Sequence, residues 1–196
     1  MPREGHELLP VELLNENNGA IERAIAQAIA ANEESHTEPL ELYDTRGIRM
    51  AYKLSAEGSI YTEKEDSGKV KQSINMSVII RDGVNHIFVG ERHIQTDLST
   101  DADKLITFTS GLLISVGFEG LGIGTALFQA TEDMIQWAIG RFPNHFRNKT
   151  IKIIIQDTAK STNPKLDRNG WTSRRTDGKY RRLSAFSASK FVKYIQ

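Results

Sequence analysis

Four glycines within eight residues are the strongest candidate for chemistry in this 196-residue chain. They stand in the sequence GFEGLGIGTAL, residues 117–127, and a segment with the apolar spacing of a helix follows them. The start of a helix carries unpaired N–H groups and about half a positive charge, so it attracts anions. Glycines ahead of it let a phosphate approach the main chain without meeting a Cβ atom. The stretch therefore predicts an anion site, with tight strand–helix packing and no ligand as the alternative.

Two common phosphate-binding motifs do not fit this stretch. A P-loop carries Lys and then Ser or Thr after its last glycine, but Thr125 and Ala126 follow Gly124. The dinucleotide fingerprint G-x-G-x-x-G is not met either, because Thr125 stands where the third glycine is required. The antiparallel strands expected upstream also argue against both architectures.

The segment FEGLGIGTAL, preceded by the predicted strand LLISV, resembles the acyl-CoA loop of the GNAT superfamily of N-acetyltransferases. Members of that family read Q/R-x-x-G-x-G/A, commonly RGxGIGxxL after an aromatic residue. NGW, residues 169–171, lies near the place where the family has a Gly–aromatic pair at its sixth strand. The matching loop positions are Phe118, Gly120, Gly122, Ile123, Gly124 and Leu127.

The resemblance implies one GNAT-like α+β domain over residues 1–196. Its central sheet would be mostly antiparallel, with a strand–glycine loop–helix–strand unit and splayed central strands. The cofactor implied is acetyl-CoA or another short acyl-CoA, whose acyl group a primary amine would take by direct attack on the thioester. N–H groups from Leu121 through Thr125 would hold the pyrophosphate, and the strand end at 114–116 would pair with pantetheine. The implied cofactor-binding residues are Ile114, Ser115, Val116, Glu119, Gly120, Leu121, Gly122, Ile123, Gly124 and Thr125.

The chain departs from the family pattern in two ways. Glu119 stands where the family prefers Gln or Arg, and like charges about 5 Å apart repel by roughly 1 kcal/mol in water. Many members have a tyrosine after the fifth strand as general acid, but residues 158–170 contain none. Both departures favour the alternative of a catalytically silent GNAT-like module that binds acyl-CoA or regulates another protein.

Only weak candidates for a catalytic acid or base are present. Glu91 and His93 are two residues apart on a predicted strand, so their side chains share a face. In the GNAT family a glutamate on the sheet often orders water to deprotonate the amine, which makes Glu91 the candidate base; a solvated polar face is the alternative. Tyr180, in DGKYRR, is the candidate proton donor, with a turn or strand start as the alternative. The histidines lack metal-ligand spacing, so no metal is expected.

Strands dominate the middle of the chain. ELYDTRGIRMAYKL, residues 41–54, is typical of a strand or hairpin, and EKEDSGK, residues 63–69, of an exposed turn. QSINMSVII, residues 72–80, alternates apolar and polar side chains, and RDGVN predicts a hairpin turn into residues 86–97. Residues 104–116 form the best-defined strand. One face of it is predicted to carry Ile106, Phe108, Leu112, Ile114 and Val116.

The two ends of the chain are predicted less firmly. A helix is expected over residues 19–32, with Asn17 or Asn18 as N-cap, whereas HELLPVELL offers a first strand that Pro10 weakens. Residues 1–40 form a candidate N-terminal helical extension that serves homodimerisation or covers the acceptor site. After the glycine stretch we expect a helix up to Gly140, a buried strand over 149–157 and closing strands near 171–175 and 183–194.

Composition restricts the function classes. Hydrophobic residues make up 39% and charged residues 26%, as in ordinary globular proteins, and the absence of cysteine excludes disulfides and thiolate metal sites. No apolar run reaches the roughly 18 residues of a membrane span, and a cytoplasmic location is expected. Residues 1–66 carry 14 acidic and 6 basic side chains, and residues 160–196 carry 2 and 10. The basic end could contact nucleic acid, the 3′-phosphate of CoA or an acidic acceptor, or form an exposed hairpin. A small molecule or a protein amine is the expected acceptor.

Overall fold

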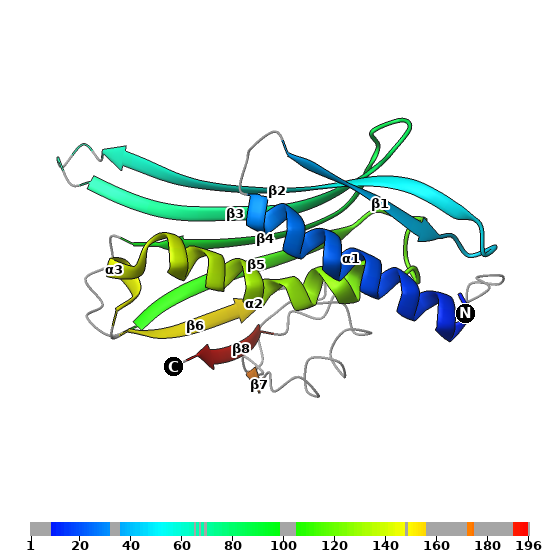
Figure 1. The fold of residues 1–196 in the computed structure, drawn as a ribbon. Coiled ribbons are helices and arrows are strands. Elements are labelled where there is room, and N and C mark those ends of the chain that lie inside the picture. Colours follow the sequence, from blue (N-terminus) through cyan, green and yellow to red (C-terminus); the bar gives the residue numbers. More distant parts are fainter. Residues whose placement is uncertain are drawn as a thin grey trace. The chain divides into compact units, whose positions relative to one another are not determined.

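The computed structural model describes residues 9–31, 36–64, 66, 68, 70–98, 105–147, 149–155, 172–174 and 190–195 (Figure 1). Three helices and eight strands are described within these ranges. In chain order they are α1 Val11–Ala31, β1 Thr37–Tyr43, β2 Arg49–Lys64, β3 Val70–Asp82, β4 Phe88–Asp97, β5 Leu105–Ile114, α2 Ile123–Arg141, α3 Pro143–Phe146, β6 Thr150–Ile155, β7 Thr172–Arg174 and β8 Lys190–Ile195.

The strands follow the order β1-β2-β3-β4-β5-β6-β8-β7. β1 and β2 are antiparallel, as are β6 with β8 and β7 with β8. β5 and β6 are parallel, and α2 lies between them in the chain and supplies the crossover that a parallel pair needs. The predicted α+β class, with a mostly antiparallel sheet and a strand–glycine loop–helix–strand unit, is confirmed.

The chain divides into two compact units. Unit 1 consists of Met1–Gly58, Met76–His93 and Leu112–Trp137, and unit 2 of Ser59–Asn75, Ile94–Gly111 and Ala138–Gln196. Strands β2 to β5 each contribute residues to both units, so the sequence has no single point at which one unit ends and the other begins. One domain over residues 1–196 stays a prediction.

Unit 1 has a core built from α1, α2 and alternate residues of its strands. Ile21, Ile25 and Ala28 lie one helical turn apart on α1 and are fully or almost fully buried, which confirms the predicted apolar stripe. Val78 and Ile80 on β3 are fully buried, and they alternate with the half-buried Ser77 and Ile79. From α2 the core takes Leu127, Met134 and Ile135.

Helix α1 begins eight residues earlier than the predicted helix, at Val11 rather than residue 19. The Pro10 carbonyl accepts the Leu14 N–H at 2.9 Å, so Pro10 takes the N-cap position. The predicted Asn17 or Asn18 cap is therefore wrong, because both residues lie inside the helix. The strand offered for HELLPVELL is wrong for residues 11–14. A proline immediately before a helix costs no intrahelical hydrogen bond, so it marks a start here rather than an interruption.

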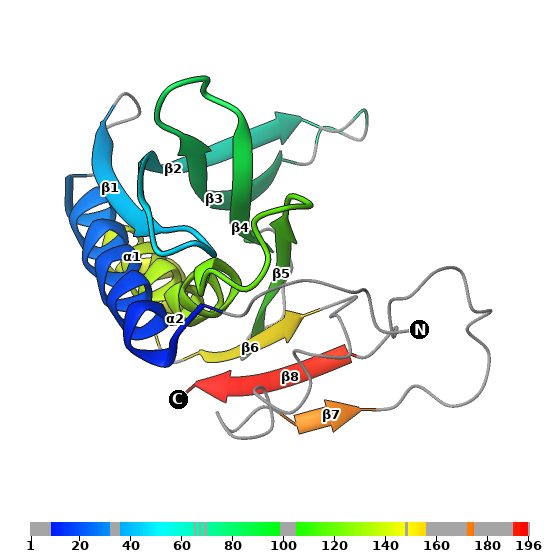
Figure 2. The ribbon, with the colours of Figure 1, turned by 90° about the vertical axis from the view of Figure 1, so that its right-hand side faces the viewer.

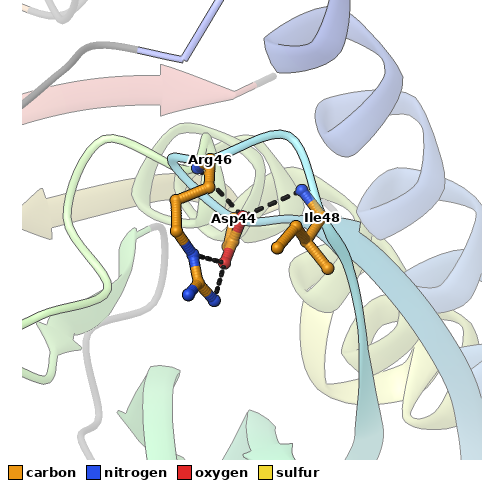
Figure 3. A network of polar contacts seen from close by, with 3 residues as sticks. All are labelled: Asp44, Arg46 and Ile48. Carbon is orange, nitrogen blue, oxygen red and sulfur yellow. Dashed lines mark hydrogen bonds and ion pairs between the residues drawn. The ribbon is translucent and has the colours of Figure 1, made fainter.

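The β1–β2 hairpin confirms the predicted hairpin at 41–54. Its turn is organised by the Asp44 carboxylate, which accepts the N–H groups of Arg46 and Ile48 at 2.9 Å each and pairs with the Arg46 guanidinium (Figure 3). The Ile48 N–H, followed by the Arg46 groups, holds the pKa of Asp44 below its usual value of 3.8. The turn thus needs an acceptor at residue 44 and a glycine at Gly47, where φ is +75°.

Strand β5 ends at Ile114, two residues before the end of the predicted strand. Ile106 and Phe108 are buried as expected, but Val116 is 84% exposed, so its place on the buried face was wrongly predicted. The cause is a turn directly after the strand, where the Phe118 N–H donates to the Ser115 carbonyl at 3.2 Å. Alternation stops where the extended backbone stops.

Unit 2 holds the parallel pair and the closing strands. β5 pairs with β6 from Leu105↔Thr150 to Ser110↔Ile155, whereas β5 itself continues to Ile114. Phe108 stacks on Phe146 with ring centroids 5.9 Å apart, and Ile153 is fully buried. β7 falls inside the predicted closing strand at 171–175, and β8 overlaps the one at 183–194 but extends to Ile195. β5 and β6 are thus paired over all the described residues of β6, so the predicted splay of the central strands stays a prediction. Residues 156 and 157 of the predicted strand and the NGW segment lie outside the described residues.

None of the helices in the described ranges combines the length and the apolar character that a membrane crossing requires.

Candidate functional site

The glycine loop, residues 117–124, joins β5 to α2 within unit 1. Its backbone has φ of +95° at Gly117, +84° at Gly120 and +86° at Gly122. Residues with a Cβ rarely adopt this left-handed conformation, so the loop requires glycine at these three places. The glycines are thus explained locally by the backbone, and the question is what the exposed main chain faces.

Two of the three left-handed glycines face open space. Apart from the two neighbours in the chain, no atom of the described residues lies within 4 Å of the position that a Cβ would take at Gly117 or at Gly120. Gly124, in the first turn of α2, would meet only Ile114 Cγ1 at 3.7 Å. An anion can therefore approach the loop backbone at Gly117 and Gly120. Main chain without covering side chains, ahead of a helix N-terminus, is one requirement of a phosphate site.

Gly122 faces helix α1 instead. A Cβ there would lie 2.2 Å from Asn18 Oδ1 and 3.1 Å from Leu14 Cδ1. The Asn17 carboxamide also donates to the Leu121 carbonyl at 3.1 Å, and Leu121 is buried. At Gly122 the absence of a side chain therefore serves packing of α1 against the loop, which was the alternative for the whole stretch.

The start of α2 leaves few main-chain donors for a ligand. The N–H groups of Thr125 and Ala126 donate to the Gly122 carbonyl at 3.0 and 3.1 Å, which makes Gly122 the N-cap. Ile123 and Gly124 precede this first bond, so their N–H groups belong to the unpaired set at a helix start. Of the predicted donors from Leu121 through Thr125, Thr125 is engaged within the helix.

Glu119 places a carboxylate on the loop itself. Its Oε2 accepts the Gly117 N–H at 2.7 Å, and the contact is exposed. A short bond to an ionised acceptor is among the stronger hydrogen bonds in proteins. The loop backbone thus already binds one anionic oxygen, and that oxygen belongs to the residue that departs from the family pattern.

At the end of β5, successive residues direct their main-chain N–H and C=O groups to opposite edges of the strand. The Ser115 N–H donates to the Val89 carbonyl and its Oγ–H to the Phe88 carbonyl, each at 2.9 Å, so Ser115 is bound to β4. Successive peptide groups of a strand point to opposite edges, and Ile114 therefore presents its N–H and C=O away from β4. Of the residues predicted to pair with pantetheine, Ile114 fits best, whereas the Ser115 N–H is already used.

The candidate base Glu91 is half-buried on β4 and accepts the Ser77 Oγ–H from β3 at 3.0 Å. His93, on the same face, is exposed. Glu91 is thus held in one orientation by a neighbouring strand, as a positioned base requires, but its role stays a prediction. The candidate proton donor Tyr180 lies outside the described residues.

Arg92, which sequence reasoning missed, is the largest fully buried side chain among the described residues. Its Nε and Nη2 donate to Thr131 Oγ1 at 2.8 and 2.6 Å, and its guanidinium lies 5.0 Å from the Phe128 ring centroid. Nη1 has no hydrogen-bond partner within the described residues. Burial lowers the pKa of Arg92 to about 9. The residue fastens β4 to the middle of α2, one strand residue away from Glu91.

Comparison with known proteins gave structural neighbours only. No family model matches the chain, and no curated protein matches it. An acetyltransferase of the GNAT family from Streptococcus pneumoniae aligns over 62% of this chain and 67% of its own, at 15% identity and a TM-score of 0.39. The Salmonella typhimurium acetyl transferase that modifies the N-terminal serine of 50S ribosomal subunit protein L7/L12 aligns over 62% and 64%, at 13% identity and a TM-score of 0.33.

The GNAT domain of S. lividans PAT aligns over 61% of each chain, at 13% identity and a TM-score of 0.33. The alignments thus span between 61% and 67% of these neighbours. The order of elements here is the one that the GNAT resemblance implied: a run of strands, the glycine loop, a helix and a parallel strand. The topology therefore confirms the expected fold.

Proposed function

We propose that the chain transfers an acetyl or other short acyl group from acyl-CoA to a primary amine. The observation that carries the proposal is the open main chain at Gly117 and Gly120, directly ahead of the N-terminus of α2. A loop of this kind suits the diphosphate of a nucleotide cofactor, because it offers N–H groups and a helix dipole without side chains in the way.

Different parts of the acyl-CoA molecule would bind along one continuous segment, from the end of β5 to the start of α2. The loop at Gly117–Gly120 and the N–H group of Gly124, in the first turn of α2, would hold the diphosphate, whereas Ile123 is fully buried. The edge of β5 at Ile114, which no described strand pairs, would pair with the amide groups of pantetheine and fix the thioester beside the strand. Acyl-CoA supplies an acyl carbon already activated for attack, so the protein contributes mainly positioning and proton removal.

Glu91 is the residue we assign to proton removal. An amine attacks only as the free base, and a carboxylate held by the Ser77 hydroxyl can take the ammonium proton directly or through one water molecule. The acceptor is a small molecule or a protein amine. The Salmonella neighbour is described as acting on a protein N-terminus, which makes protein amines a class to include among the acceptors tested.

A second candidate function is acyl-CoA binding without catalysis. The Glu119 carboxylate on the Gly117 N–H favours it, because a cofactor phosphate must displace or tolerate this charge. The two candidates differ in a single measurement, the release of free CoA thiol in the presence of an amine.

Calorimetric titration with acetyl-CoA tests the site. Gly120→Asp adds a carboxylate where a Cβ meets no atom, and Asp tolerates the left-handed conformation better than most residues, so the fold should survive. Gly120→Asn is the neutral match. Gly68→Asp makes the same change at φ +80° in the β2–β3 turn, also in open space, and serves as the distant control.

We expect Gly120→Asp to lose measurable binding, Gly120→Asn to weaken it by less, and Gly68→Asp to bind as the parent does. Equal binding by Gly120→Asp and the parent would remove the loop from the site. Thiol release with a panel of amines then separates the enzyme from the silent module. Gly122 is a poor position for this test, because any Cβ there collides with Asn18.

A further inference from the structure

A polar cleft of about 410 Å³ lies between α1 and β1 in unit 1. Figure 2 shows the helix alongside this strand, and the two elements are in contact. The cleft is lined by one face of α1 and by the outer side of β1, and no residue of the glycine loop takes part. We call it the edge groove. Its lining includes Gly19, Ala20 and Arg23 from α1, Glu41 and Tyr43 from β1, and Arg49 from β2.

β1 is the first strand of the sheet, so one of its edges has no strand partner within the described residues. The Asp44 N–H donates to the Ile48 carbonyl at 2.8 Å, which makes this a hydrogen-bonded pair of the hairpin. Bonded and non-bonded pairs alternate along an antiparallel ladder. The register Tyr43↔Arg49 and Glu41↔Ala51 therefore turns the main-chain groups of Tyr43 and Glu41 outward. Pro39, which has no N–H to offer, occupies the next outward position.

One of these outward positions already binds an amide. The Tyr43 N–H donates to Asn17 Oδ1 at 2.8 Å, and Asn17 Nδ2 donates to the Tyr43 carbonyl at 2.9 Å. The carboxamide of Asn17 thus bonds the strand edge as a peptide group of an added strand would. Glu41, two residues along, presents the same pair of groups to the edge groove, and no described residue bonds them.

The rest of the groove suits a peptide main chain with charged side chains. Gly19 and Ala20 carry little or no side chain, so they leave room between the helix and the strand. The charged residues of the lining have both signs: Glu16, Arg23, Glu41 and Arg49. Arg49 is held by the Tyr43 hydroxyl at 2.9 Å and by the Glu41 carboxylate at 3.4 Å, whereas Arg23 has no ion-pair partner within the described residues. Side chains of either sign on an added strand find an opposite charge.

We propose that the edge groove binds an extended peptide segment of another protein, which adds a strand to β1 at Glu41. Main-chain bonds to Glu41 provide the affinity, and the flanking arginine and glutamate side chains select the sequence. Asn17 closes the groove at the Tyr43 end. This proposal does not depend on acyl transfer, because its residues lie outside the glycine loop.

Two capped pentapeptides test the proposal, acetyl-Glu-Val-Thr-Val-Lys-amide and acetyl-Lys-Val-Thr-Val-Glu-amide. Their opposite charge order allows an added strand to run in either direction. Each is titrated into the ¹⁵N-labelled full chain to 2 mM, and amide shifts and intermolecular NOEs are recorded. We expect one peptide to shift the amides of Glu41 and Ala20, to slow hydrogen exchange at Glu41 and to give NOEs to β1.

Two substitutions at one residue isolate the main-chain bond. Glu41→Ala and Glu41→Pro both remove the carboxylate, but only proline also removes the outward N–H, which takes no part in the β1–β2 ladder. We expect binding about 10-fold weaker in the proline variant than in the alanine variant, since a main-chain hydrogen bond is lost and its acceptor in the peptide is left unpaired. Equal affinity of the two variants would overturn the added strand.

A larger side chain at Gly19 would fill the edge groove without destabilising the protein. Gly19→Leu places a side chain in the groove where its Cβ meets only Arg23 Nη1 at 3.4 Å, and leucine favours a helix more than glycine does. We expect lost peptide binding with an unchanged or higher melting temperature. The proposal is overturned if neither peptide shifts these amides at 2 mM, or if the shifts lie elsewhere. It is equally overturned if the same amides shift with protein concentration alone, since a second copy would then be the occupant.

Discussion

Removing the charge of Glu119 should strengthen CoA binding. Glu119 Oε2 accepts the Gly117 N–H at 2.7 Å, on the loop main chain that would receive the diphosphate. Glu119→Gln keeps an oxygen acceptor of the same reach for this N–H, so the loop geometry is retained. The substitution therefore removes the charge while it retains an acceptor for this N–H.

The magnitude follows from Coulomb's law. Two unit charges about 5 Å apart repel by roughly 0.8 kcal/mol in water, and a diphosphate carries two such charges, which gives roughly 1.7 kcal/mol. Partial exclusion of water raises this value, and salt lowers it because the Debye length at physiological ionic strength is about 8 Å. A net gain of about 1–2 kcal/mol corresponds to a dissociation constant roughly 5- to 30-fold lower.

Calorimetry with CoA at low and high salt measures this gain. Glu119→Asp keeps the charge, and Glu132→Gln removes an exposed carboxylate from α2, so both serve as matched controls and should bind within about 2-fold of the parent. The gain of Glu119→Gln should shrink as salt rises. Unchanged or weaker binding by Glu119→Gln at low salt would show that no phosphate lies near the carboxylate, and the assignment of the loop would be wrong.

Three further substitutions test the packing around the loop and the hairpin. Asn17→Leu leaves two groups of the β1 edge and one carbonyl without their side-chain partner, and chemical denaturation should show a loss of about 2–4 kcal/mol. Gly58→Ala places a Cβ 2.3 Å from Trp137 Cη2, and thermal unfolding should show a loss of about 1–3 kcal/mol. The pKa of Asp44 is lowered in the folded chain, so its contribution to the free energy of unfolding is complete above its usual pKa of 3.8 and is lost as pH falls through the lower folded value. Asp44→Asn should therefore lower the free energy of unfolding at neutral pH. In strong acid this difference from the parent should vanish.

Local patterns predicted the elements well where a single periodicity operates. The alternation in residues 72–80 marks β3, and the turn residues at Asp82 and Gly83 mark the hairpin into β4. α2 could be predicted because its apolar residues keep helical spacing between the glycine loop and Pro143. In each case the pattern that predicts the element lies within about 20 consecutive residues. Contacts with residues far along the chain stabilise the same element and do not change it.

What the sequence could not show is which distant segment covers an open backbone. The four glycines look alike in sequence, yet Gly120 faces open space and Gly122 faces Asn18. The difference comes from α1, about 100 residues away, whose packing position no local pattern encodes. Arg92 was missed for a related reason. Its charge suggests a surface residue, but Arg92 shares with Gly90 and Ile94 the face of β4 that packs inward. This spacing of two residues from apolar neighbours was the signal that the sequence offered.

Asn17 connects the two sites that we propose. One carboxamide bonds the Tyr43 edge, where the groove closes, and the Leu121 carbonyl, where the glycine loop meets α1. Gly120→Asp should therefore affect CoA binding alone, because Gly120 lies in the glycine loop and not in the edge groove. Glu41→Pro should affect peptide binding alone, because Glu41 lies in the edge groove and not in the loop. Asn17→Leu should weaken both, since it frees α1 from the strand and from the loop at once. A variant at Asn17 that folds and binds both ligands as the parent does would show that α1 is positioned by its apolar face, and that the carboxamide contributes to neither site.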